Sequence, residues 1–69
     1  MNTVLLQAFI AVMQHKSVSK AAEQLHLTQP AISKRLRNLE QELAVRLFDH
    51  IGRQVQPTAA AQRLLPQAE

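Results

Sequence analysis

The 69-residue sequence contains no cysteine, a single glycine and no long run of apolar residues. Without cysteine the chain forms neither disulfide bonds nor a cysteine-ligated zinc site, and this composition fits the reducing cytoplasm. No apolar stretch approaches the roughly 18 residues of a membrane-spanning helix, and the start at Met1 and Asn2 lacks the basic and apolar regions of a signal peptide. We therefore expect a cytoplasmic domain without a membrane partner.

The charge of the chain is unbalanced toward lysine and arginine. Eight basic side chains stand against five acidic ones, and the isoelectric point is about 10.2. The bases of the central segment are Lys16, Lys20, Lys34, Arg35 and Arg37, and the acid there is Glu23. Clustered bases favour a polyanionic partner, nucleic acid first, although many basic chains bind none. The length allows one domain with a modest core, because short chains bury only about 60% of their unfolded surface.

Apolar residues recur at helical spacing in three segments. Positions 6, 9, 10 and 13, positions 18, 21, 22 and 25, and positions 32, 36, 39 and 43 each form one stripe. The first segment predicts a helix over about 3–15. The second predicts a short helix capped by Ser17 or Ser19, whose hydroxyl accepts a hydrogen bond from a first-turn amide. The third predicts a helix over about 29–43, with Thr28 as its N-cap and Pro30 in its first turn.

The second and third predicted helices are separated by a tight turn. Leu27 falls in this turn, and we expect it to lie between the two helices. Ala21 and Ala22 allow the close approach of a helix-turn-helix crossing, although any compact helical bundle favours alanine at such points.

The pattern changes after residue 43. Positions 45 and 47 and residues 54–56 alternate apolar and polar, which indicates two short strands. Residues 49–53 lie between them and contain Gly52, so we expect a hairpin that turns near this glycine.

A fourth helix follows the predicted hairpin. Pro57 ends the second strand, Thr58 caps a helix over 59 to about 65, and Pro66 terminates or kinks it. The sequence thus predicts a mostly α fold with a small β-hairpin, in the order of three helices, a hairpin and another helix.

The third helix has the properties of a helix that reads the major groove of DNA. Its apolar stripe anchors it to the core, and its opposite face carries Gln29, Ser33, Lys34, Arg37, Asn38 and Gln41. Glutamine pairs with adenine, serine with several bases, and Ala31 is small enough to meet a thymine methyl. The free amides at its N-terminus favour a phosphate. How the three bases at positions 34, 35 and 37 divide between phosphates and guanine stays open.

The hairpin and the second helix offer further contacts. Arg53, together with His50, is placed to reach the backbone or the minor groove, and a solvated turn that contacts nothing is the equal alternative. Lys20, near the start of the second helix, is a candidate phosphate contact.

The run Ser-Val-Ser-Lys-Ala-Ala-Glu-Gln-Leu-His-Leu-Thr-Gln-Pro-Ala-Ile-Ser over residues 17–33 resembles the LysR-type transcriptional regulators. The later pairs Leu39-Glu40, Leu47-Phe48 and Pro57-Thr58, with Arg53, strengthen the resemblance, which covers nearly the whole chain. It implies a winged helix-turn-helix over residues 1–58, in which the hairpin near 49–54 is the wing. Residues 59–69 then begin a linker helix that pairs two DNA-binding domains.

The resemblance also implies a function and partners. A regulator of this family binds double-stranded DNA at interrupted inverted repeats as a homodimer or homotetramer. A C-terminal domain, absent from this chain, binds a small-molecule effector. The positions matching Gln29, Pro30, Ser33 and Lys34 face the groove, and the position matching Arg53 lies on the wing. The predicted DNA-binding residues are Gln29, Pro30, Ala31, Ser33, Lys34, Arg37, Thr28, Lys20 and Arg53.

The sequence departs from this family at four positions. Glycine is usual at Lys16, Ala44 and Ala61, and arginine at His50. The two alanines are mild changes if the backbone there stays in ordinary regions. His50 replaces a permanent positive charge, which puts its DNA contact in doubt or makes it pH-sensitive.

Two other functions compete with DNA binding. An enzyme is disfavoured because His15, His26 and His50 lack metal-ligand spacing and a core this small frames no cleft, so we expect neither catalytic residues nor a metal or cofactor. A winged-helix protein–protein interaction module is the better alternative. Salt dependence separates the two, because DNA binding through phosphates weakens steeply as salt rises.

Overall fold

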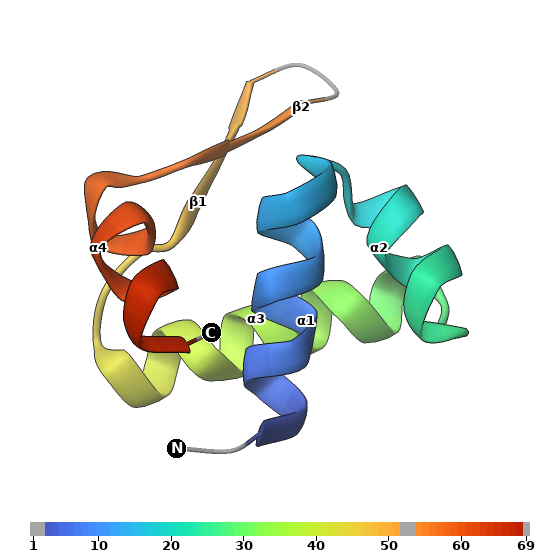
Figure 1. Cartoon of the computed structure of the whole chain (residues 1–69), viewed down its shortest axis with the longest axis horizontal. Coiled ribbons are helices and arrows are strands. Elements are labelled where there is room, and N and C mark those ends of the chain that lie inside the picture. The colour runs from blue at the N-terminus through green and yellow to red at the C-terminus, as the bar shows by residue number, and fades with distance from the viewer. Residues whose placement is uncertain (1–2, 52–53, 69) are drawn as a thin grey trace.

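Four helices and a two-stranded hairpin follow one another along the described part of the chain. The computed structural model describes residues 3–51 and 54–68. Its elements are α1 (Thr3–His15), α2 (Val18–Leu25), α3 (Gln29–Leu43), β1 (Phe48–Ile51), β2 (Gln54–Pro57) and α4 (Ala59–Ala68), shown in Figure 1. The predicted order of the elements and the predicted bounds of the first and third helices are confirmed, and the second predicted helix is present.

The starts of α2 and α3 are set by hydroxyl caps. The Ser17 Oγ accepts a hydrogen bond from the Lys20 amide at 3.2 Å, so Ser17 and not Ser19 is the cap of α2. The Thr28 Oγ1 accepts from the Ala31 amide at 3.3 Å, and Pro30 lies in the first turn of α3. Each cap satisfies an amide that has no partner inside its helix.

The first three helices end in left-handed residues, none of which is glycine. Lys16, His26 and Ala44 have φ angles of 52°, 57° and 54°. The left-handed conformation brings Cβ close to the following carbonyl oxygen and costs a residue other than glycine about 1 kcal/mol or more. The backbone at Ala44 is therefore not ordinary, and alanine there is not a mild change. Ala61 lies inside α4, where alanine is compatible with the helical backbone.

The core lies where α1 crosses α2 and α3. The largest fully buried side chains are Phe9, Ile32, Leu39, Leu47 and Val12. Small side chains, Ala8, Ala11, Ala21 and Ala22, are buried beside them and let the helices approach closely. Figure 1 shows α1 crossing α3, with α2 on one side of this crossing and α4 on the other.

The hairpin begins later than the sequence pattern indicated. β1 and β2 pair antiparallel, from Phe48 opposite Pro57 to Ile51 opposite Gln54. Positions 45–47 are a connection and not a strand, whereas residues 49–51, expected in the turn, belong to β1. Leu47 is buried in the core, and its amide donates a hydrogen bond to the Glu40 carboxylate on α3. This amide is therefore not paired with a neighbouring strand. As predicted, β2 ends at Pro57.

The base of the hairpin packs against the helices. The centroid of the Phe48 ring lies 5.8 Å from the centroid of the Phe9 ring on α1, with an interplanar angle of 50°. Such tilted pairs are favourable beyond their buried area. Val55 on β2 is buried in the same core.

Thr58 joins the hairpin to α4. Its Oγ1 accepts from the Ala61 amide at 3.3 Å, as the predicted cap requires, and donates to the Arg46 carbonyl at 2.6 Å. Its amide donates to the Leu47 carbonyl at 2.9 Å.

The predicted end of α4 near residue 65 was wrong. The helix continues to Ala68 and contains Pro66. Proline removes one hydrogen bond from the last turns of the helix. The half-buried Leu65 and Ala68 still pack against the core and favour the helical continuation.

We predict that Ala44→Gly raises the free energy of unfolding by about 0.5–1 kcal/mol, because glycine relieves the left-handed strain. Thermal unfolding followed by circular dichroism should show a melting temperature higher by about 3–6 °C. Ala60→Gly, inside α4, is the control and should lower stability by about 1 kcal/mol. A loss of stability in both variants would contradict the strain at Ala44.

We predict that Thr58→Ala lowers the free energy of unfolding by about 1–2 kcal/mol, because it removes both bonds of the hydroxyl. Urea unfolding measures the change. Thr58→Ser keeps the hydroxyl and should lie near the original chain, and equal losses in the two variants would show that the hydroxyl is dispensable.

Candidate nucleic-acid interface

The turn between α2 and α3 fixes the start of α3. The Leu27 amide donates to the Ala22 carbonyl at 2.9 Å, and the half-buried Leu27 side chain packs against the core as expected. Ala21 and Ala22 are buried, so that α2 lies close against its neighbours. The N-terminal half of α3 is thereby held from one side and left open on the other.

The two faces of α3 differ sharply. Ile32, Leu36 and Leu39 are buried. The exposed side chains near its open face are Gln29, Pro30, Lys34, Arg37, Asn38 and Gln41, and Ala31 and Ser33 are half-buried beside them. Each candidate residue that the sequence placed on this helix is thus exposed or half-buried, and none belongs to the buried stripe of α3. Thr28 is exposed at its start.

The lysines and arginines of this surface form no ion pair within the described residues, and Glu40 is the acid that lies beside Arg37. Within residues 3–51 and 54–68, one ion pair is formed: the Arg46 Nε lies 3.0 Å from the Asp49 Oδ1. The charges of Lys34 and Arg37 on α3 therefore remain available to an external anion, as does that of the exposed Lys20 in the first turn of α2. The free amides at the start of α3 add a partial positive charge.

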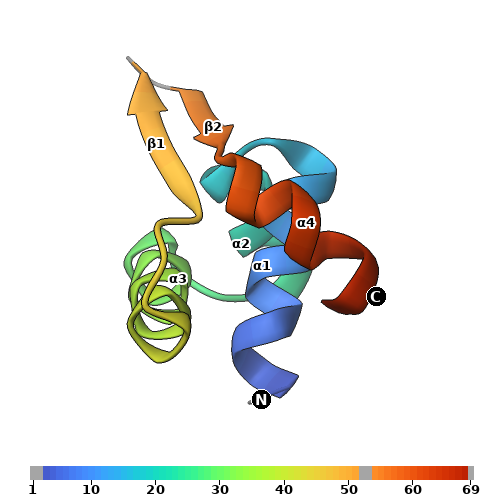
Figure 2. The same cartoon turned by 90° about the vertical axis from the view of Figure 1, so that its left-hand side faces the viewer.

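The hairpin lies on the same side of the molecule as α3. Figure 2 shows both at the left of the view, with the hairpin rising above α3 and α4 on the opposite side. A hollow between them is lined by Ser33 and Arg37 from α3 and by Phe48 and Val55 from the strands. A ligand that contacts the polar face of α3 therefore passes next to the hairpin.

Two of the predicted contact residues, Arg53 and His50, belong to the predicted hairpin. Arg53 lies outside the described residues. His50 pairs with Val55 across the hairpin through its backbone position.

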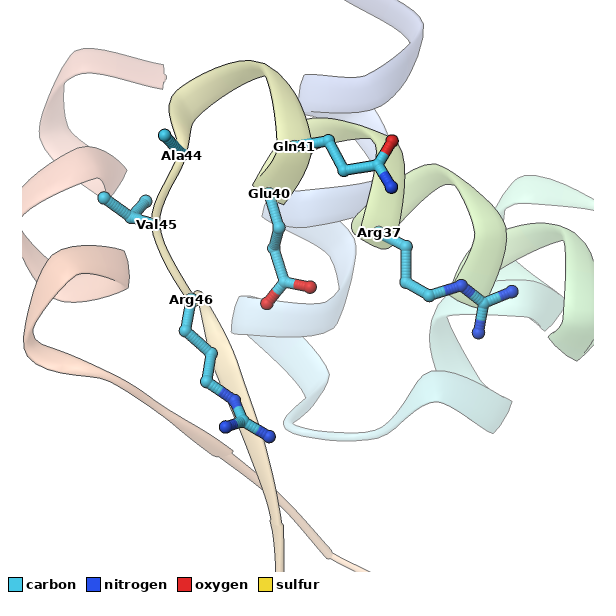
Figure 3. A pocket seen from close by; sticks show the side chains of 6 residues that line it. All are labelled: Arg37, Glu40, Gln41, Ala44, Val45 and Arg46. Atoms are coloured by element: carbon cyan, nitrogen blue, oxygen red, sulfur yellow. The ribbon is translucent and has the colours of Figure 1, made fainter.

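Sequence reasoning missed the role of Glu40. Its Oε2 accepts from the Leu47 amide at 2.7 Å and from the Phe48 amide at 3.3 Å. The signal was present only as the Leu39-Glu40 pair of the family pattern, which does not reveal a partner seven residues away. Figure 3 shows the Glu40 carboxylate between Arg37 and Arg46, directed toward the chain that leads into β1.

The side chains that could bind a metal ion do not cluster in the described part of the chain. No group of three or more histidine, aspartate or glutamate side chains there is arranged to hold an ion. His15 instead forms a hydrogen bond of 2.6 Å from Nε2 to the Gln24 Oε1. None of the helices within the described ranges combines the length and the apolar character needed to span a bilayer.

Comparison with known proteins adds to this geometry. Residues 4–62 match the family model described as bacterial regulatory helix-turn-helix protein, lysR family. An uncharacterized HTH-type transcriptional regulator of Azotobacter vinelandii is 57% identical over 68 residues, which cover 99% of this chain and 47% of that protein. The HTH-type transcriptional regulator HdfR of Escherichia coli is 45% identical over 69 residues, all of this chain and 25% of HdfR. The chain thus spans about half or less of these relatives.

Solved structures show the same backbone. The crystal structure of the CbnR_DBD–DNA complex matches 99% of this chain and 78% of that chain, with a TM-score of 0.93 and 35% sequence identity. This likeness confirms the winged helix-turn-helix fold expected from the sequence.

Proposed function

Because this chain belongs to the lysR family of bacterial regulatory helix-turn-helix proteins, we propose that it binds double-stranded DNA with α3 in the major groove. The observation that carries this proposal is the exposed polar face of α3, whose Lys34 and Arg37 form no ion pair within the described residues, on the same side as the hairpin. The similar CbnR domain in complex with DNA supports it.

The side chains of α3 divide into base-reading and backbone contacts. Gln29 and Ser33 read base edges, while Pro30 and Ala31 allow the helix to approach the groove floor. Lys34 and Arg37 meet phosphates or guanine. Thr28 holds the first turn of α3, Lys20 binds a phosphate beside α2, and Arg53 contacts the backbone or minor groove from the wing.

The whole protein needs more than this domain. Residues 1–58 form the DNA-binding domain, and residues 59–69 begin the linker helix that pairs two such domains. A homodimer or homotetramer in the cytoplasm then binds an interrupted inverted repeat, with half-sites one helical turn or a multiple apart. A C-terminal domain of the whole protein binds a small-molecule effector and controls transcription, as the resemblance to the family implies.

We predict that the chain binds duplex DNA with a steep salt dependence. If Lys20, Lys34 and Arg37 each neutralise one phosphate, the log–log slope is about −2.7, and affinity falls roughly 40-fold between 50 and 200 mM salt. Fluorescence anisotropy with a labelled random-sequence duplex measures this slope.

Two variants control the salt experiment. Lys34→Gln should reduce the slope by about 0.9, whereas Arg63→Gln, an exposed base on α4, should leave it unchanged. A chain that binds no duplex at low salt, or binds it equally at all salt concentrations, would support the protein-interaction alternative.

We predict that Gln29→Ala and Ser33→Ala erode sequence discrimination by about 1–3 kcal/mol at the bases they contact. Sites selected by the original chain from a random duplex pool provide the substrate, and competition with single-base variants provides the measurement. Gln67→Ala on α4 is the matched control, and equal loss of specific and non-specific binding in the Ser33 variant would remove its base-reading role.

A further inference from the structure

The connection between α3 and the hairpin is held by one carboxylate. Glu40 is half-buried in α3, and its Oε2 accepts hydrogen bonds from two consecutive amides, Leu47 at 2.7 Å and Phe48 at 3.3 Å. Hydrogen bonds to an ionised acceptor are roughly twice as strong as those between neutral groups. A single side chain therefore ties the first residue of β1 directly to the recognition helix proposed above.

Further contacts hold this connection to α1 and α4. Phe48 packs on Phe9 of α1, and the carbonyls of Arg46 and Leu47 accept from Thr58 at the start of α4. The main chain also joins α3 to the connection, through the Val45 amide and the Glu40 carbonyl at 3.2 Å, but this bond lies before the bend into the hairpin. Among the hydrogen bonds of the described residues, those of the Glu40 side chain run from α3 to the first residue of β1, beside the apolar packing of Leu47 and Phe48 in the core.

The hairpin extends away from the residues that Glu40 binds, so a small rotation at its base moves its far end by a larger distance. Each strand has four residues, and the three steps from Phe48 to Ile51, at about 3.3 Å each, place the far end roughly 10 Å from Phe48. A rotation of about 15° at Phe48 therefore displaces the far end of the strands by about 3 Å, which separates a hydrogen bond from a missed contact. The direction of β1 relative to α3 decides whether both elements reach one duplex.

We propose that Glu40 is a positioning residue: its carboxylate sets the hairpin at the angle that lets α3 and the hairpin contact the same DNA. This inference rests on the proposed DNA-binding function. The negative charge of Glu40 by itself weakens DNA binding, because DNA is also negatively charged. The proposed positioning role strengthens binding, so the two effects have opposite signs.

The test compares Glu40→Ala with Glu42→Ala. Both variants remove one carboxylate from α3, and Glu42 is exposed on that helix. Charge alone predicts equal or tighter DNA binding in both. Positioning predicts that E40A binds a random-sequence duplex roughly 10-fold more weakly than E42A, with a salt slope smaller by about 0.9 for each phosphate that the displaced hairpin no longer reaches.

Both measurements are made at a temperature where circular dichroism shows both variants fully folded. Amide hydrogen exchange adds a local readout: the Leu47 and Phe48 amides should exchange faster in E40A, while the Leu36 amide in α3 stays protected. A purely structural role would lower the free energy of unfolding and leave the affinity and salt slope of the folded molecules at the E42A values.

The outcomes separate the two proposals. If the original chain binds DNA and E40A matches E42A in affinity and slope, the positioning role is overturned and DNA binding stands. If the original chain binds no duplex, both fall. Should E40A fail to fold, E40Q takes its place with E42Q as the control. Glutamine keeps one acceptor at position 40 but loses the charge, so positioning predicts that DNA affinity follows the protection of the Leu47 and Phe48 amides. An affinity that falls while these amides stay protected, or that keeps the E42Q value after they lose protection, overturns the positioning role.

Discussion

The rest of the structure depends on the packing of α3 against the core through Ile32, Leu36 and Leu39. These side chains are buried in the core and fix the rotation of the helix about its axis. Rotation by half a turn would place leucines in water and lysine and arginine in the core, at a cost of several kcal/mol. The polar face is therefore held outward by the packing of the opposite face.

Much of the fold could be predicted because its determinants are local. The stripes at helical spacing and the hydroxyls of Ser17 and Thr28 define helix bounds within a few residues of sequence. The accessible surface of α3 followed from the same periodicity, since residues opposite a buried stripe face solvent.

The failures of the sequence-based predictions have non-local causes. The start of β1 at Phe48 depends on burial of Leu47 and on a carboxylate seven residues earlier. Persistence of α4 through Pro66 depends on packing of the residues around it against the core. The left-handed turn at Ala44 follows from where the chain must go next, which alanine alone does not encode. Contacts at the hairpin turn, including Arg53, remain predictions.

The contact between Phe9 and Phe48 has a consequence for the entropic cost of folding. The two rings come from the first helix and the first strand, so that their contact closes a loop of more than half of the chain. The contacts among α1, α2 and α3 span shorter loops and form at smaller entropic cost. Loop closure therefore gives the contact between the hairpin and α1 a slightly larger entropic cost than the contacts among the three helices.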